Sequence, residues 1–432
     1  MEAIDPFDFR SWQVLNRHGG SVNRRYLCRV APEFSTLVPM ISEEEARTRI
    51  LEAIGPLSPR KAALADGLNY FAAQDYFART PLPVFDNSAM DGYAVVASSC
   101  APGRRLRVVG EQPAGLDRQL RISAGEAVRI FTGAPILVGA DAVVMQEDVT
   151  RDGDDIVINA KVAENDFIRR RGCDLAEGQK VLTKGARIRP TVLALLASQG
   201  LAEAIIGGEV DAAIISTGDE LIRAGGQIQA GQIYESNSVL LEALLRRMGV
   251  LVRSVEHCAD ETKRLTGVIK RGAENDVLII SGGVSVGQHD LVKSTLQSLG
   301  GQIDLWRVAI KPGKPFLFGR LGDCAVFGLP GNPVSAFVTF LQFVRPAILK
   351  MMGASDDELE LPKFTAQLAV DVRNDGDRVH YMRGKLLDGN FTPVGRQESH
   401  ALFALSQSNA LLRVAPGAEL KSGAAVRVEI WD

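Results

Sequence analysis

The sequence predicts a multidomain α/β protein with one parallel-sheet α/β domain, two small β domains and a helical linker domain that is split in the chain. Between residues 210 and 354, buried strands alternate with helices at the spacing typical of a parallel sheet with crossover helices. Over residues 85–172 and 355–432, short strands are separated by Gly, Pro and Asp-Gly turns instead. With 432 residues, the chain is also too long for one ordinary core, so several domains are expected.

The composition excludes several classes of protein. Hydrophobic residues make up 46% and charged residues 23%, as in a soluble globular protein. A net charge of -3 argues against nucleic acid as a partner. The five cysteines are scattered without CxxC or Cys/His spacing, so we expect neither disulfides nor zinc, which fits a reducing cytoplasm. We expect no membrane span and no signal peptide, because no apolar run has the length or position of either.

Residues 1–38 are rich in arginine and show no sustained periodicity, so we expect a disordered extension. A transit peptide is the alternative. Acidic residues in the first eight positions argue against it, because transit peptides are poor in acids.

The linker domain is expected to combine residues 39–84 with residues 173–209. Ser42 and Glu45 form a capping box, and apolar residues then recur at helical spacing until Gly55 and Pro56 stop the helix. A second helix is expected over residues 61–68. A third is expected over residues 190–200, an apolar segment with Pro at its start and Gly at its end.

The first small β domain, residues 85–172, is expected to contain five short strands, at residues 93–96, 106–109, 127–131, 142–145 and 156–158. It begins with FDNSAMDGY, which by composition alone is an Asx-rich turn leading into a strand. A second turn starts at Thr132. A third holds Arg169, Arg170 and Arg171, which usually would form a solvated face but could also clamp a phosphate-rich ligand.

The α/β domain contains a strand, residues 277–280, that runs into a loop with Gly282, Gly283 and Gly287. Other strands are expected over residues 212–216 and 250–255, with helices over residues 239–248 and 261–273. The loop leads into a helix that Asp290 can cap. Such a junction is a common phosphate site, because glycine lets a ligand approach the backbone at the positive end of a helix dipole. The loop matches neither the dinucleotide-binding nor the P-loop motif, so taken alone it is a weak signal.

Acidic residues follow the strands of this domain. Glu220, Asp260 and Asp290 should meet at one edge of the sheet, because parallel strands end together. Each alone could be a turn residue or helix cap, and we expect Asp219 to be turn structure. Several carboxylates in one crevice repel one another unless a cation is present, and Mg²⁺ prefers such oxygen ligands.

Two further loops are rich in proline. Lys311 and Lys314 lie in KPGKP, where fixed positive charges suit an oxyanion, although an ordinary surface loop is the alternative. GLPGNP precedes Ser335 and a long helix expected over residues 336–351, which Pro346 should kink. The last segment, residues 355–432, is expected to form a small β-barrel with strands over residues 364–372, 379–387, 410–414 and 425–430.

Taken together, SGGVSVGxxD, IKPGKP, GLPGNP, FDNSAMDGYA and RRRGxD resemble the motifs of the molybdopterin molybdenumtransferase family. These MoeA-like enzymes include the gephyrin E domain and its plant counterparts, and the resemblance runs from near Val38 to the C-terminus. It implies that the α/β domain is MogA-like and binds molybdopterin. It also implies a homodimer in which the sheet domain of one subunit and the small β domain of the other share an active site.

The resemblance implies a Mg²⁺-dependent transferase that inserts molybdate into adenylylated molybdopterin and releases AMP and molybdenum cofactor. Molybdopterin adenylyltransferase and apo-molybdoenzymes or carrier proteins would be its partners in the cytoplasm. Two alternatives remain open. The adenylyltransferase shares the sheet domain but lacks DNSAMDGYA and the C-terminal β domain, and a scaffold of the same fold would be free to lose the acids and lysines that are present here.

The resemblance also implies roles for individual residues. The catalytic candidates are Asp86, Glu220, Asp260, Asp290, Lys311 and Lys314, of which Glu220, Asp260 and Asp290 would hold the metal. The candidates for binding substrate or molybdate are Thr132, Asp174, Ser281, Gly282, Gly283, Ser285, Gly287, Arg307, Pro315, Pro330, Gly331, Asn332, Pro333, Ser335, Arg383 and Ser399. Arg307 stands where relatives carry lysine, and Arg383 and Ser399 rest on the resemblance alone.

Overall fold

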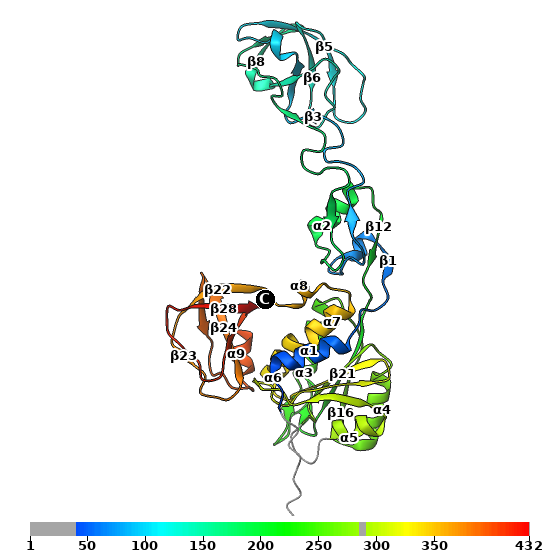
Figure 1. The fold of residues 1–432 in the computed structure, drawn as a ribbon, viewed down its shortest axis with the longest axis vertical. Helices are drawn as coiled ribbons and strands as arrows, with labels where there is room; N and C mark the ends of the chain where they lie inside the picture. Colours follow the sequence, from blue (N-terminus) through cyan, green and yellow to red (C-terminus); the bar gives the residue numbers. More distant parts are fainter. Residues whose placement is uncertain (1–39, 285–290, 432) are drawn as a thin grey trace, which may run out of the picture. The chain divides into compact units, whose positions relative to one another are not determined.

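The computed structural model describes residues 40–284 and 291–431 (Figure 1). The extension expected over residues 1–38 lies outside the described residues, as do three site candidates, Ser285, Gly287 and Asp290.

Helix α1 (Glu43–Ala53) forms, and the capping prediction is confirmed. The Ser42 hydroxyl accepts a hydrogen bond from the Glu45 backbone N–H at 3.0 Å. Its buried residues Ala46 and Ile50 belong to the core cluster of the α/β domain, so this helix does not pack with the linker segments to which it was assigned. Helix α2 (Pro190–Ser198) also forms as predicted, with proline in its first turn.

The helix predicted over residues 61–68 is wrong. That segment forms strand β1 (Arg60–Ala63) and a 3₁₀ turn (Leu64–Gly67). The strand pairs antiparallel with β12 (Glu203–Ile206), and Lys61 forms an ion pair with Glu203. Pairing with a strand distant in sequence therefore overrides the local helical pattern.

The first β domain is built on a six-stranded sheet in the order β7-β4-β6-β5-β9-β8, which is antiparallel except for the pair β5 and β6. All five predicted strands are present. A Cβ atom on Gly92, in the DGY turn, would lie 1.9 Å from the Val144 carbonyl oxygen, so only glycine allows this packing. The strands are β4 (Gly92–Val95), β5 (Arg105–Gln112), β6 (Glu126–Ile130), β7 (Ala142–Met145), β8 (Val149–Asp152) and β9 (Asp155–Ile158).

Four short strands precede and follow this sheet. Strand β3 pairs with β10, and β2 pairs with β11, both antiparallel. Two 3₁₀ turns also occur in this part of the chain. These elements are β2 (Tyr76–Phe77), β3 (Asn87–Ser88), β10 (Ile168–Arg169), β11 (Lys180–Leu182), and the turns Ala97–Ser99 and Gln146–Asp148.

The α/β domain has a six-stranded sheet in the order β16-β13-β17-β21-β20-β18. The first four strands are parallel, as predicted for β13, β16 and β17, whereas β20 near the edge is antiparallel to both of its neighbours, β21 and β18. The sheet as a whole is therefore mixed, because β20 and β21 form a tight hairpin instead of a helical crossover. The strands are β13 (Asp211–Thr217), β16 (Leu251–Cys258), β17 (Val277–Ser281), β18 (Gln302–Trp306), β20 (Leu317–Leu321) and β21 (Cys324–Leu329).

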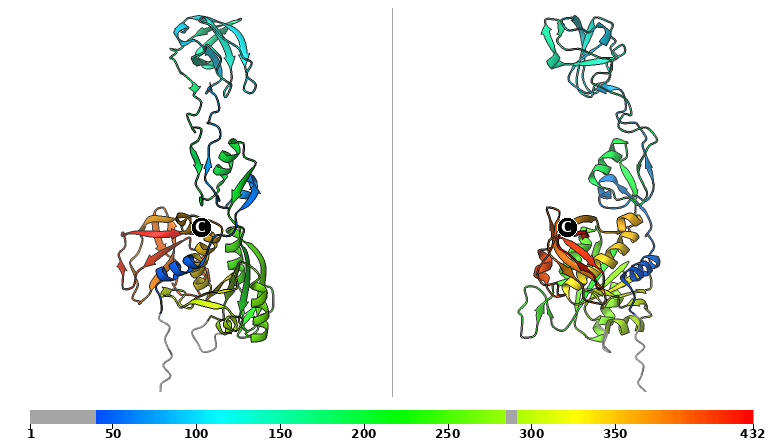
Figure 2. Two further views of the ribbon diagram at one scale, coloured as in Figure 1. Left: turned by 45° about the vertical axis from the view of Figure 1, so that its right-hand side comes forward. Right: turned by 60° about the vertical axis from the view of Figure 1, so that its left-hand side comes forward.

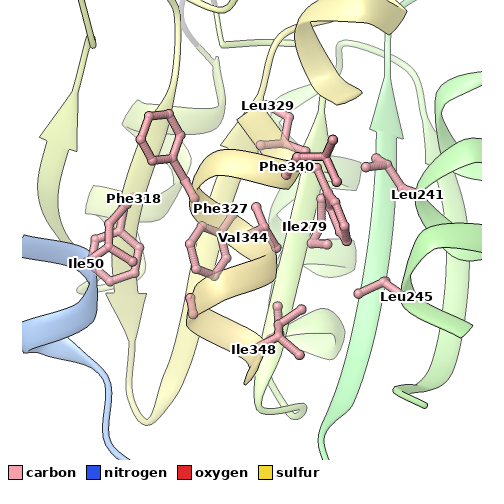
Figure 3. Packing of buried hydrophobic residues seen from close by; sticks show 14 of the residues in the cluster. Ile50, Leu241, Leu245, Ile279, Phe318, Phe327, Leu329, Phe340, Val344 and Ile348 are labelled. Atoms are coloured by element: carbon pink, nitrogen blue, oxygen red, sulfur yellow. The ribbon is translucent and has the colours of Figure 1, made fainter. Parts of the chain in front are cut away.

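Helices cover both faces of this sheet (Figures 1 and 2). On one face, Leu241 and Leu245 of α3 (Asn237–Arg247) pack with Ile279 of β17, together with the helical segment that follows β21 (Figure 3). On the other, α4 (Thr262–Gly272) and α5 (Leu291–Ser298) pack against β13 and β17. The central strands are therefore buried on both sides. The segment that connects β13 to α3 contains two short strands that pair with each other, β14 (Leu221–Ile222) and β15 (Ile233–Tyr234).

The helix predicted over residues 336–351 is interrupted. It consists of α6 (Pro333–Thr339), a π-helical turn (Phe340–Val344) and α7 (Arg345–Met351). Pro346, in the first turn of α7, has no N–H to continue the α-helical hydrogen bonding, so the wider turn accommodates it. Among the described residues, Pro333–Met351 is the one helix long and apolar enough to cross a membrane. However, 89% of its most apolar 18 residues are buried inside the protein, as expected for a core helix.

In the C-terminal domain, five strands pair in a closed ring, β24-β25-β22-β28-β26 and back to β24 (orange to red in Figure 2). Strand β19 (Ile310–Lys311) adds to β24, so the KPGKP loop is fastened to this ring. The other elements are β22 (Lys363–Leu368), β23 (Val372–Arg373), β24 (Val379–Leu387), β25 (Asn390–Pro393), β26 (Ala410–Val414), β27 (Glu419–Leu420), β28 (Ala425–Ile430), α8 (Asp356–Leu359) and α9 (Leu402–Ser406).

Candidate functional site

A cavity of about 1040 Å³ lies at the carboxyl ends of strands β13, β17 and β21. The segments that follow these strands line it, together with the KPGKP loop and residues 397–400 and Leu402 of the C-terminal domain. This is the edge of a parallel sheet at which ligands are expected. The predicted site residues that line it are Glu220, Asp260, Ser281, Gly282, Gly283, Lys311, Lys314, Pro315, Pro330, Gly331, Asn332, Pro333, Ser335 and Ser399.

The glycine loop after β17 packs tightly against the neighbouring strand. Gly282 and Gly283 have φ of +91° and +66°, which disfavour other residues. A Cβ atom on Gly282 would lie 2.3 Å from the Thr217 carbonyl oxygen. The Gly282 N–H donates to the Leu329 carbonyl oxygen at 3.1 Å, which fixes the loop against β21. Glycine is therefore required here by both conformation and space.

Glu220 and Asp260 both line the cavity. The Thr217 hydroxyl donates a hydrogen bond to the Asp260 carboxylate, and the Asp260 backbone N–H donates to the Asp219 carboxylate at 3.0 Å. Asp219 thus holds the turn, as predicted. Asp260 does not cap α4, whose cap position is Glu261.

The metal prediction rests on Glu220, Asp260 and Asp290, the last of which lies outside the described residues. Across residues 40–284 and 291–431, no three His, Cys, Asp or Glu side chains gather closely enough to hold a metal. Glu220 and Asp260, which line the cavity together with the glycine loop, nevertheless provide hard oxygen ligands of the kind that Mg²⁺ takes, since this ion usually completes its shell with water and substrate phosphate.

Among the described residues, two lysines, one arginine and His400 line the cavity. Lys311 and Lys314 were predicted, but Arg378 was not. The Arg378 guanidinium donates to the Ile310 carbonyl oxygen at 3.2 Å, which ties it to the KPGKP loop. His380 is paired with Lys311 in the register of β19 and β24. Burial, reinforced by Lys311, Arg383 and Arg378, lowers the pKa of His380 to about 4, so this imidazole is neutral at pH 7.

The GLPGNP loop meets the C-terminal domain inside the cavity. The Asn332 side chain donates to the Ser399 hydroxyl at 2.9 Å, and the Val334 N–H donates to the Ser399 carbonyl oxygen at 3.1 Å. Ser335, 4% exposed, also lines the cavity. Ser399 therefore lines the cavity and is held by the start of α6.

Arg383 lies elsewhere. It is 1% exposed and is not among the described residues that line the cavity, and neither is Arg307. The Arg383 guanidinium donates to the Arg396 carbonyl oxygen, and its backbone exchanges hydrogen bonds with the Gln397 side chain at 3.0 and 2.9 Å. Arg383 thus supports the loop that carries Ser399.

Asp86, Thr132 and Asp174 belong to other parts of the chain and do not line the described cavity. Asp86 accepts hydrogen bonds from the Arg171 backbone N–H at 2.7 Å and from the Arg170 guanidinium. These two contacts hold the pKa of Asp86 below its usual range, so it is ionised at neutral pH.

The three turns predicted separately in the first β domain form one cluster. The Gly133 N–H donates to the Ser88 carbonyl oxygen at 2.8 Å, and β3 pairs with β10 next to the arginines. Thr132 donates to the Asp91 carboxylate through its N–H and its hydroxyl. The Asp174 backbone N–H donates a hydrogen bond to the Leu82 carbonyl oxygen at 3.0 Å, which places Asp174 beside Leu82.

Thr217, Asn237 and Arg378 are among the lining residues that sequence reasoning missed. Thr217 and Asn237 flank elements that were predicted, and a polar residue at a strand end or helix start is by itself unremarkable. The position of Arg378 depends on the pairing of β19 with β24, which leaves no local signal.

Comparison with known proteins supports a single family. Three family models cover the chain: the MoeA N-terminal region (domain I and II) over residues 41–200, a probable molybdopterin binding domain over residues 213–350, and the MoeA C-terminal region (domain IV) over residues 365–431.

Curated relatives and solved structures agree. A molybdopterin molybdenumtransferase of Haemophilus influenzae is 38% identical over 86% of this chain and 94% of its own length. Molybdopterin molybdenumtransferase 2 of Mycobacterium tuberculosis is 35% identical over 91% of this chain and 100% of its own length. The crystal structure of the molybdopterin biosynthesis moeA protein from Pyrococcus horikoshii matches 91% of this chain and 100% of its own, with a TM-score of 0.77 and 28% identity. The chain therefore belongs to the molybdopterin molybdenumtransferase family.

Proposed function

We propose that this protein is a molybdopterin molybdenumtransferase that inserts molybdate into adenylylated molybdopterin, releasing AMP and molybdenum cofactor. The observation that carries the proposal is the composition of the cavity. A glycine loop, carboxylates that include Glu220 and Asp260, and the basic side chains of Lys311, Lys314 and Arg378 are brought to one sheet edge by segments far apart in sequence. This combination suits a reaction between an oxyanion and a phosphorylated substrate.

The basic and acidic groups have separate tasks. Lys311, Lys314 and Arg378 neutralise molybdate, so that it can approach a negatively charged substrate. Gly282 and Gly283 line the cavity without side chains, so the pyrophosphate can come close to the backbone there. Glu220 and Asp260 would hold Mg²⁺, which when bound supplies positive charge to the pyrophosphate. The Thr217 hydroxyl orients Asp260 for this task.

The homodimer that the resemblance implies is part of the proposal, because it would give the cluster around Asp86 a task. Asp86 is ionised and held by arginines, yet it does not line the described cavity. A two-fold dimer in which this cluster faces the cavity of the partner subunit gives these residues a role in the same reaction. A molybdopterin adenylyltransferase would supply the substrate in the cytoplasm, and apo-molybdoenzymes or carrier proteins would receive the product.

The test is AMP release from adenylylated molybdopterin by the purified protein, with molybdate and Mg²⁺ each present or omitted. Release that needs both, together with cofactor able to activate an apo-molybdoenzyme, is the expected result. ATP consumption on free molybdopterin would instead identify an adenylyltransferase. Tight substrate binding without release would identify a scaffold or carrier.

A further inference from the structure

We infer that Asn237 is a positioning residue of the phosphate site, which holds the Ser281 hydroxyl as a hydrogen-bond donor toward an anionic oxygen in the cavity. The inference rests on the proposed function, because it assumes that phosphate groups bind beside the glycine loop. It adds a residue and a task that the motifs of the loops themselves do not contain.

Asn237 connects three segments that are distant in the sequence. It is the first residue of α3, is 7% exposed and lines the cavity. Its side-chain nitrogen Nδ2 donates to the Ser281 hydroxyl oxygen at 2.9 Å and to the Gly331 carbonyl oxygen at 2.7 Å. Ser281 ends β17, and Gly331 lies in the loop after β21. One side chain therefore fixes the spacing of both loops.

The hydrogen bonds also determine the orientation of the Ser281 hydroxyl. A carbonyl oxygen can only accept, so the Asn237 atom facing Gly331 must be the nitrogen. Its two hydrogens are then directed to Gly331 and to Ser281. Because the Ser281 oxygen accepts from Asn237, its own hydrogen must point to another acceptor. Ser281 lines the cavity, and an anionic ligand oxygen there would be such an acceptor.

Helix capping does not account for Asn237. The cap position of α3 is Ser236, whose side chain makes no capping hydrogen bond. Glu235 does the capping instead, because its carboxylate accepts the Ser238 N–H at 2.8 Å and also the Ser238 hydroxyl. The Asn237 side chain is therefore directed to the two loops.

A double-mutant cycle tests whether Asn237 acts through Ser281. Binding of inorganic pyrophosphate is measured by calorimetry for the wild type, Asn237→Ala, Ser281→Ala and the double variant, at one salt concentration. Each single substitution should raise Kd about tenfold, the value of one charge-assisted hydrogen bond. The double variant should bind about as weakly as Ser281→Ala alone. Asn275→Ala is the matched control, because the Asn275 side chain also donates to a backbone carbonyl oxygen, of Gly272, but lies outside the cavity.

The outcomes separate the inference from the proposed function. If Asn237→Ala binds pyrophosphate with the wild-type Kd while Ser281→Ala binds it more weakly, the inference alone is overturned. The same holds if the losses in binding free energy of the two single variants add fully in the double variant. Failure of the wild type to bind pyrophosphate overturns both. Thermal unfolding shows whether each variant folds. If Asn237→Ala does not fold, Asn237→Asp replaces it, since a carboxylate has the shape of the amide but cannot donate a hydrogen bond to Ser281.

Discussion

Replacing Gly282 with alanine should damage the glycine loop far more than the single methyl group suggests. Gly282 has φ of +91°, where an alanine costs about 1–2 kcal/mol. Its Cβ would also lie 2.3 Å from the Thr217 carbonyl oxygen. Backbone atoms at that distance must move, and such overpacking typically costs a further 1–3 kcal/mol or so.

Gly300 offers a matched control for the backbone contribution. It has a similar φ of +85°, but a Cβ there would meet nothing within 4 Å. Gly300→Ala should therefore cost only about 1–2 kcal/mol. Gly282→Ala should be less stable than Gly300→Ala by roughly 1–3 kcal/mol and should also lose pyrophosphate binding, because the loop shifts.

Urea unfolding followed by circular dichroism measures the free energy of unfolding of both variants, and calorimetry measures pyrophosphate binding. Equal destabilisation of the two variants, with wild-type binding in Gly282→Ala, would refute the reasoning about close packing at this loop.

Three more predictions concern charge. His380 has a folded pKa of about 4, so below about pH 6.5 the unfolded chain binds a proton that the folded chain does not. Urea unfolding should therefore show stability falling by up to about 3 kcal/mol from pH 6.5 to 4, and His380→Gln should remove this part of the pH dependence. Arg413→Ala leaves the buried Glu43 carboxylate without its ion pair. The free energy of unfolding should fall by about 2 kcal/mol, less than for a fully buried pair, because Arg413 is partly exposed to solvent. Thermal unfolding measures the change, and an unchanged Tm would contradict this. Lys311→Ala and Asp290→Ala should each abolish cofactor formation without unfolding the protein, and wild-type activity in both would disprove the assigned site.

The sequence predicts best the features that are encoded locally. The apolar run over residues 277–280 and the glycines after it place β17 and its loop, and Ser42 and Glu45 place the start of α1. Strand β1 was mistaken for a helix because its structure depends on pairing with β12. Periodicity could not show that β20 and β21 form a hairpin rather than a crossover, because both connections join apolar strands.

The site follows the same rule. Glycines, prolines and acids at strand ends mark the cavity, because their conformational and charge requirements are visible in the residue types. Arg378 and Asn237 gave no such signal, since each acts through contacts with segments remote in sequence. The buried position of Arg383, behind the loop that carries Ser399, likewise depends on the way the C-terminal strands close.

The central claim is that molybdate binds in the cavity at the carboxyl ends of β13, β17 and β21. Anomalous diffraction at the molybdenum absorption edge, from crystals grown with molybdate and AMP, tests it most directly. The account predicts a molybdenum peak within reach of Lys311, Lys314 and Arg378. A peak outside this cavity, in crystals of protein that releases AMP in a molybdate-dependent manner, would contradict it.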